Sequence, residues 1–388
     1  MRGEARRGAG QAGRRRVART GMALALLAAA SAGPARAEWT AETGVHVDAW
    51  SGAGQNGHQV LAPFGLAWNS PSWGARLRGA IGTTERDPGG GLPDGSVTGF
   101  TDTTLSGYYR LAIGALEVRA GLDLDLPTGQ SSLKSRDLAA VQDEDLALLE
   151  RFGEGFDVNP TLSVYRSFGI VGIGAGVGYL YRGSYDRTQD FVNDDLDPGD
   201  ELTALVLADV LLGDAWRLLG QVGFTTYGTD ERGGKETFQE GDEVDLRAAV
   251  EWRPEPWWVV VAVRDVIRTK AERLNTAGRL TTEPRNSRGN DFRAGVTAGY
   301  ILDDVWNLAL AVELRYVAAN DYPESNPLFD GGRTKVAVGP SVTWTPDRRF
   351  GVEGTARYFF MDAERSPVFP QAGTIHGVHL DLRVLYRF

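Results

Sequence analysis

The chain has 388 residues, a formal net charge of −10 and no cysteine. The lack of cysteine excludes disulfides, thiol chemistry and a lipid-modified N-terminal cysteine, and the acidic balance argues against nucleic acid as a partner. The 50 glycines follow no Gly-X-Y period, which is typical of tight turns and close strand contacts rather than of collagen.

Residues 1–37 have the pattern of an export signal. Three consecutive arginines at 14–16 precede a short apolar core at 21–30, and Ala35-Arg36-Ala37 is a small-residue cleavage site. The core is too short to span a bilayer. We therefore expect cleavage near Ala37 and a mature chain of residues 38–388. That mature chain has no run of eighteen apolar residues and so no predicted transmembrane helix.

Apolar and polar residues alternate with a period of two along the whole mature chain, which predicts β-strands. We count about sixteen, each near the ten residues that a tilted strand needs to cross the hydrocarbon layer. Merging one weak hairpin would leave about fourteen. The predicted strands are 40–50, 59–69, 74–84, 98–111, 116–126, 157–167, 171–183, 201–212, 216–229, 243–253, 257–269, 290–302, 306–318, 334–345, 350–361 and 375–388.

The connections between these strands alternate in length. Short turns such as 213–215, 254–256 and 303–305 alternate with longer polar loops such as 185–200 and 270–289. Tryptophans flank the short turns, at Trp68, Trp73, Trp216, Trp252, Trp257, Trp306 and Trp344. This pattern predicts an all-β fold: a transmembrane, antiparallel, up-and-down β-barrel with its short turns and an aromatic girdle on the periplasmic side.

The C-terminal strand carries apolar or aromatic side chains at every second position, including Leu382, Val384, Tyr386 and Phe388. In a soluble β-sandwich, the alternative fold, this strand would be an exposed edge. A membrane barrel instead needs it to pair with the first strand. The segment resembles the C-terminal signature of bacterial outer-membrane barrels. That resemblance implies recognition by the barrel-assembly machinery, a place in the cell outer membrane, and contact with its lipid and lipopolysaccharide.

The polar face of each predicted strand is assigned to the barrel lumen. The candidate lumen-lining residues are Arg76, Arg78, Arg110, Glu117, Arg119, Asp123, Asp125, Arg247, Glu251, Arg293, Glu313, Arg315, Arg357, Asp381 and Arg383. Charges of both signs are tolerated there only in water or in pairs. Two roles stay open for them: ion pairs that brace the wall, or a ring of charge that selects ions.

The longest connection, 127–156, follows the fifth predicted strand. Residues 137–151 are rich in helix formers and Asp137 is placed to cap a helix, on which Leu138, Val141, Leu148 and Leu149 would form an apolar stripe. A connection this long in a compact fold is usually functional or disordered.

The position of this connection resembles that of the constriction loop of sixteen-stranded general porins, although their eyelet motif is absent. The resemblance implies an acidic face toward a narrowed pore, formed by Asp143, Glu144, Asp145 and Glu150. An inward constriction and an outer flap both stay open.

Acidic residues also cluster in the outer loops 185–200 and 230–242. Clustered carboxylates can bind the divalent cations that bridge lipopolysaccharide, or remain as solvated charge. Their spacing matches no dedicated calcium loop, so we predict no metal site and no cofactor.

Three segments carry a more particular resemblance: Leu124-Asp-Leu-Pro-Thr-Gly129, Phe156-Asp-Val-Asn-Pro-Thr-Leu-Ser-Val164 and Val171-Gly-Ile-Gly-Ala-Gly-Val-Gly-Tyr-Leu-Tyr181. Across about residues 116–230, the chain is similar to outer-membrane proteins of the phenol-degradation MetA-pathway family, which are described as transporters. This resemblance implies a barrel that passes small compounds, including aromatic ones, and it supplies no catalytic residues.

The predicted function is therefore passive diffusion of small solutes through a mixed-charge lumen. The alternative is a filled barrel that acts as a structural, receptor or adhesion protein through its acidic outer loops. A hydrolase is a third alternative, because His46 and His379 lie on the first and last strands, near Asp48 and Asp381. No serine or cysteine nucleophile lies in a recognisable setting near them, so no enzyme is predicted.

Overall fold

The computed structural model describes residues 37–190, 195–367 and 369–388. The predicted export signal falls outside the described residues except for Ala37. Within the described residues, no helix is long and apolar enough to cross a membrane.

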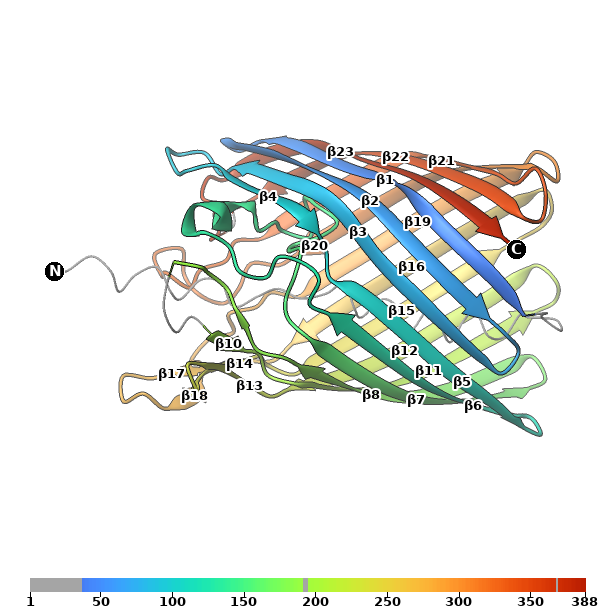
Figure 1. Cartoon of the computed structure of the whole chain (residues 1–388), viewed down its shortest axis with the longest axis horizontal. Helices are drawn as coiled ribbons and strands as arrows, with labels where there is room; N and C mark the ends of the chain where they lie inside the picture. The colour runs from blue at the N-terminus through green and yellow to red at the C-terminus, as the bar shows by residue number, and fades with distance from the viewer. Residues whose placement is uncertain (1–36, 191–194, 368) are drawn as a thin grey trace.

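The main chain forms one large antiparallel sheet (Figure 1). Its strands are β1 (Glu38–Gly52), β2 (Gln55–Asn69), β3 (Trp73–Asp87), β4 (Gly95–Phe100), β5 (Thr103–Ile113), β6 (Leu116–Leu126), β7 (Asp157–Phe168), β8 (Val171–Arg182), β11 (Glu201–Leu212), β12 (Trp216–Tyr227), β15 (Glu243–Trp252), β16 (Trp257–Arg268), β19 (Asp291–Ile301), β20 (Trp306–Val317), β21 (Arg333–Trp344), β22 (Phe350–Ala363) and β23 (Gly373–Arg387). Because β4 and β5 pair in succession with β3, they occupy a single place in the sheet. The barrel therefore has 16 strands, as the sequence predicts.

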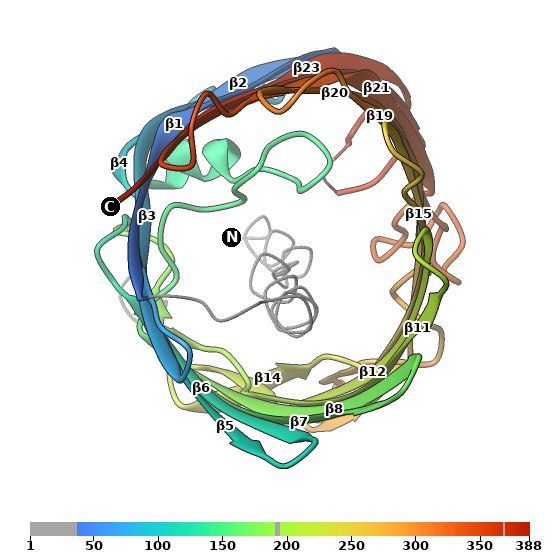
Figure 2. The same cartoon turned by 90° about the vertical axis from the view of Figure 1, so that its right-hand side faces the viewer.

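The sheet closes on itself where the first strand meets the last (Figure 2). β1 pairs antiparallel with β23 from Thr40↔Arg387 to Gly52↔Ile375. The backbone N–H of Phe388 extends this seam by donating to the carbonyl of Trp39 at 3.1 Å. A closed antiparallel barrel confirms the predicted fold class and excludes the soluble sandwich with an exposed terminal edge.

The outer surface of the barrel is apolar. On β20, Leu310 and Val312 are 54% and 46% exposed, whereas Ala311 between them is 2% exposed. Aromatic side chains gather at the short-turn end, where Trp39 lies 5.1 Å from Trp68 and Trp216 lies 5.8 Å from Trp252, measured between ring centroids. This is the surface expected of a barrel whose wall faces lipid and whose rim faces an interface.

Three of the predicted outer loops are ordered into a second, smaller sheet. It contains β9 (Tyr185–Asp186), β10 (Asp195–Asp197), β13 (Thr229–Arg232), β14 (Lys235–Gln239), β17 (Glu272–Leu274) and β18 (Leu280–Thr282). These short strands carry the long-loop end beyond the barrel wall (Figure 1). One of the clustered acids, Glu240, binds Arg288 at 2.9 Å, and Glu243 at the start of β15 binds Arg268 at 3.1 Å.

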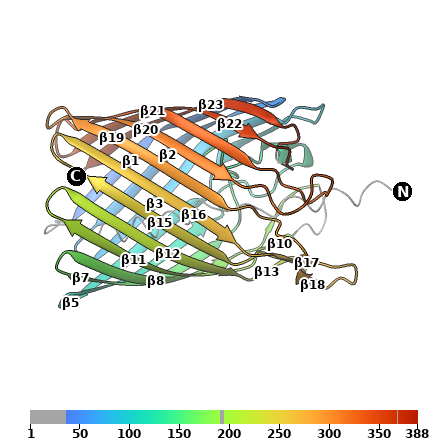
Figure 3. The ribbon, with the colours of Figure 1, turned by 180° about the vertical axis from the view of Figure 1, so that it is seen from behind.

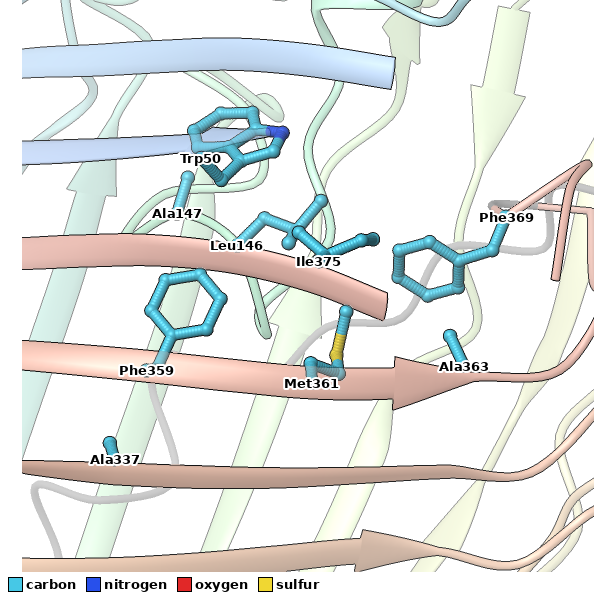
Figure 4. Packing of buried hydrophobic residues seen from close by; sticks show 9 residues of the cluster. All are labelled: Trp50, Leu146, Ala147, Ala337, Phe359, Met361, Ala363, Phe369 and Ile375. Atoms are coloured by element: carbon cyan, nitrogen blue, oxygen red, sulfur yellow. The ribbon is translucent and has the colours of Figure 1, made fainter. Parts of the chain in front are cut away.

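Residues 127–156 lie inside the ring of strands, which decides between the two placements that the sequence left open (Figure 2). Their apolar side chains pack on the wall: Leu146 is fully buried with Phe359 and Ile375 (Figure 4). Leu138, Val141 and Leu149 pack against a second buried cluster that includes Leu61 and Phe152.

The helix predicted for 137–151 is wrong. The segment contains one short 3-10 helix, Ser135–Ala140, with no side-chain cap, and Leu148 is 51% exposed rather than part of an apolar stripe. Backbone groups that a helix would pair internally bind the barrel wall instead. Wall contacts therefore override the local helix propensity.

We expect the β1–β23 seam to leave no room for a side chain at Gly44. A Cβ at Gly44 would lie 2.1 Å from the carbonyl oxygen of Leu382, whereas a Cβ at Gly220 would meet nothing within 4 Å. Gly44→Ala should lower the free energy of unfolding by about 1–3 kcal/mol through overpacking. Gly220→Ala should be neutral or stabilising by up to about 1 kcal/mol. Urea titrations of the refolded barrel in lipid, followed by tryptophan fluorescence, measure both, and equal effects would contradict this reading.

Candidate functional site

The inward segment 127–156 is fixed at its neck by one carboxylate. Asp102, in the break between β4 and β5, accepts the backbone N–H of Gly129 at 2.9 Å through Oδ1 and that of Glu154 at 2.7 Å through Oδ2. The backbone N–H of Asp102 donates to the carbonyl of Phe152 at 2.7 Å. Both ends of the segment are thus held at one point of the wall.

The middle of the segment is held by side chains of β1 and β2. Asp48 Oδ2 accepts the backbone N–H of Leu148 at 2.7 Å. The side-chain amide of Gln59 makes two hydrogen bonds to the backbone of Leu149. Its Oε1 accepts from the Leu149 N–H at 3.0 Å, and its Nε2 donates to the Leu149 carbonyl at 2.9 Å, as a neighbouring strand would. Gln59 and Asp48 are fully buried, so removing either partner would leave a polar group without its bond.

Two histidines flank the Asp48 carboxylate, as predicted from barrel closure. His46 Nε2 and His379 Nδ1 lie 2.9 and 2.6 Å from Asp48 Oδ1. The other ring nitrogens face Asp381 at 3.3 Å and the Lys335 ammonium at 2.9 Å. All four ring nitrogens are therefore occupied by groups of the wall, and the cluster orients the carboxylate that holds the segment.

The tip of the segment carries two acids into a set of basic side chains. Asp145 accepts from Arg315 and Arg333, and Glu144 accepts from Arg315 and from Arg293, the latter at 3.1 Å. Lys335 donates to the carbonyl of Asp145 at 2.5 Å. Asp143 lies 3.7 Å from Arg333 as well. The tip therefore extends along the inside of the wall to β19, β20 and β21 and is held there by ion pairs.

Burial by itself would raise the pKa of Asp145, but Arg315, Arg333 and Lys335 together hold it well below its ordinary value. A group with a lowered pKa stabilises the fold above its ordinary pKa, and that contribution is lost only as the pH falls through the lowered value. The tip contacts are therefore built to persist in mild acid.

Strands β15, β16, β19, β20 and β21 lie side by side in the wall (Figure 3), and their register places basic residues in a row. Directly paired residues share a face of a sheet, and the pairs Arg247↔Arg264, Arg264↔Arg293, Arg293↔Arg315 and Arg315↔Lys335 continue from β15 to β21. We call these five residues the basic row. The inward tip meets one end of it, at Arg293, Arg315 and Lys335.

The remaining predicted lumen residues pair mostly among themselves. Arg76 binds Glu42 at 2.6 Å, Arg110 lies 3.8 Å from Glu117, and Arg383 binds Asp381 at 2.8 Å. The register places Arg78, Arg119, Asp123 and Asp125 on the same face as these residues. Such pairs favour wall bracing over ion selection for this part of the lumen.

Four further predicted residues also have partners close by. Glu251 binds Arg253 at 3.3 Å, and Arg357 lies 3.6 Å from Glu313. Glu150 contributes its backbone carbonyl, which accepts from the N–H of Gln142 at 3.0 Å.

Several residues of the site were not predicted: Gln59, Arg264, Asp291, Arg333 and Lys335. β16 is rich in valine on both faces, so a period of two does not show which face Arg264 occupies. Asp291 and Arg333 lie at the first positions of their strands, where a sequence boundary is least certain. Their charge on the lumen face could have been read once Arg293 and Arg315 were assigned to it.

A cavity of about 670 Å3 lies between the inward segment and the wall. Its lining includes Glu144, Asp145 and Leu148 from the segment, and all five residues of the basic row. A lumen that is narrowed by an inner segment but keeps an internal space of this size can hold water and small solutes.

No protein-family model matches the sequence, and no curated protein matches it. Among solved structures, the chain is similar to OprB from Pseudomonas putida at 10% identity and a TM-score of 0.48, over 95% of this chain and 97% of that chain. It is similar to an anion-selective porin from Comamonas acidovorans at 13% identity and a TM-score of 0.42, over 91% of this chain and 99% of the porin. OccAB4 from Acinetobacter baumannii matches at 8% identity and a TM-score of 0.45, over 92% and 98% of the two chains.

At these identities the likeness concerns the barrel as a fold, and the function must come from the residues of this chain. The resemblance to the phenol-degradation family stays a prediction.

We expect Asp145→Asn to release the tip. The exchange takes one carboxylate from the buried guanidinium groups of Arg315, which keeps Glu144 and Asp291, and of Arg333, which keeps Asp143. Removing one partner from a buried ion pair costs up to about 3–5 kcal/mol. A nitroxide label at the exposed position Leu148 should become mobile in this variant. Asp137→Asn is the matched control in the same segment, because its partner Arg136 is largely exposed. Equal mobility in the two variants would contradict the ion-pair anchor.

The same label tests the effect of pH. The lowered pKa of Asp145 predicts an immobile tip from pH 7 down to about 4, close to the ordinary pKa of an aspartate. Release of the label between pH 7 and 5 would mean that the histidines around Asp48, and not the tip carboxylates, control the segment.

Proposed function

We propose that this protein is a channel for the passive diffusion of small solutes across the outer membrane of a Gram-negative-type cell. The observation that carries the proposal is the inward segment 127–156, fixed to the inside of a charged lumen that still contains a cavity of about 670 Å3. A barrel that served only as a scaffold would have no reason to keep both a held constriction and an internal space.

The outer membrane is proposed from three features together. The closed barrel leaves no unpaired strand edge toward lipid, its outer face is apolar, and its aromatic side chains gather at the short-turn rim. The predicted export signal and the C-terminal strand support the same place and imply lipid, lipopolysaccharide and the barrel-assembly machinery as partners. Leu382, Val384, Tyr386 and Phe388 stay the proposed assembly signal.

Diffusion needs no moving part in this arrangement. The segment is held at its neck by Asp102, at its middle by Asp48 and Gln59, and at its tip by the basic row. Solutes would pass beside the tip. Charged groups of both signs line this passage, so it favours hydrated polar solutes over large apolar ones. Small aromatic compounds belong to the proposal only through the family resemblance.

The two other functions receive less support. An adhesion or receptor role would use the carboxylates in and next to the outer loops. Two of these carboxylates, Glu243 and Glu240, form ion pairs with Arg268 and Arg288. A hydrolase would need a free imidazole nitrogen facing a nucleophile, but the nitrogens of His46 and His379 bind Asp48, Asp381 and Lys335.

Single-channel recording in planar bilayers tests the channel. The refolded mature chain should give discrete, ohmic steps in KCl. Excision of residues 143–149 should enlarge each step, because it removes the tip, and the Gln142–Glu150 backbone contact of 3.0 Å lets the chain rejoin. Excision of residues 276–278 from the outer loop is the control, since Asn275 and Arg279 are in contact at 2.9 Å, and it should leave the steps unchanged. A folded barrel without steps would overturn the channel.

A further inference from the structure

Next to the basic row, the register places a second row made of small and apolar side chains. Leu219↔Ala249, Ala249↔Ala262 and Ala262↔Gly295 are directly paired across β12, β15, β16 and β19. On each strand, the member of this second row lies two positions from the residue that stands in line with Arg247 and Arg264. The two rows therefore lie on the same face of the sheet, about 7 Å apart. All four residues line the cavity.

One end of the basic row carries charge that the protein does not neutralise. Arg247 and Arg264 share a single carboxylate: Asp245 accepts from Nε and Nη2 of Arg247 at 3.0 and 2.7 Å, and from Nη2 of Arg264 at 2.6 Å. Two guanidinium groups against one carboxylate leave one net positive charge. Within the described part of the chain, neither Nη1 atom has a hydrogen-bond acceptor.

The other end of the row differs in this respect. Arg293 and Arg315 face both Asp291 and Glu144, and so they are matched charge for charge. The unmatched charge therefore lies away from the inward tip, beside the apolar row. The Arg247 and Arg264 side chains keep 21% and 18% of their surface accessible, so a solute in the cavity can reach them.

We propose that this part of the lumen is a binding site for small organic anions that carry one carboxylate on a short apolar body. The carboxylate binds the Nη1 atoms of Arg247 and Arg264, which donate charge-assisted hydrogen bonds. The body lies along Leu219, Ala249 and Ala262, where the two alanines and Gly295 leave room beside the wall. Burial of the body against Leu219 removes apolar surface from water. This site adds a solute class to the proposed channel function. Its physiological use rests on that function, whereas binding of the anion does not.

Binding is measured without any current, so that the site and the channel can fail separately. The mature chain is refolded into lipid nanodiscs, and carbon-13-labelled hexanoate or acetate is titrated in while the carboxylate resonance is followed, with empty nanodiscs subtracted. Hexanoate should bind about tenfold more tightly than acetate, the effect of removing roughly two methylene groups from water. Equal binding of the two anions, or none, would overturn the site.

Variants separate the two halves of the site. Arg264→Gln removes the unmatched charge and should weaken both anions by about tenfold, the value of one charge-assisted hydrogen bond. Leu219→Asn should weaken hexanoate alone, and Ala262→Ser does the same with a smaller structural change if Leu219→Asn does not refold. Val260→Asn, on the same face of β16 but outside the cavity lining, is the control and should change neither. Loss of hexanoate binding in the control, or its persistence in Arg264→Gln, would overturn the assignment.

Discussion

The architecture of this molecule depends on one constraint. Every backbone N–H and carbonyl of a wall that faces lipid must have a hydrogen-bond partner. An unpaired group in hydrocarbon costs several kcal/mol, so the sheet has to close. The β1–β23 pairing meets this need along the whole length of both strands. Closure has a second effect, because it brings residues from the two ends of the chain together inside the lumen. The cluster of Asp48 with His46 and His379 exists only because the seam exists.

Inside the closed wall, the governing problem is charge. Arginines and carboxylates on the lumen face need water or partners, and the structure supplies partners in two ways. Some come from the next strand, as for Arg76 and Glu42. Others come from the inward segment, whose Glu144 and Asp145 meet the basic row. The segment thus narrows the lumen and neutralises part of its wall at once, and the place where this matching stops is where Arg247 and Arg264 share one carboxylate.

Local side-chain patterns and tertiary contacts carry two different kinds of information about this barrel. Strands were predicted within a few residues because a period of two is a strong local signal, as in Leu116–Leu126. The face occupied by Arg293 and Arg315 followed from the same alternation. Arg264 was missed because β16 is apolar on both faces, so its orientation depends on its partners in the sheet. The helix predicted for 137–151 failed because its backbone donors bind Asp48 and Gln59, which lie about 90–100 positions earlier in the chain.

By itself, then, the sequence determined the fold class, an approximate number of strands, the two faces of most strands and the end of the barrel that carries short turns. These properties follow from the alternation of side chains and from turn chemistry, both of which act between near neighbours. Only the tertiary structure decided that segment 127–156 turns inward, which arginines share a carboxylate, and where the lumen keeps an apolar surface. Those outcomes depend on strand register and on closure, which bring together residues that no local pattern relates.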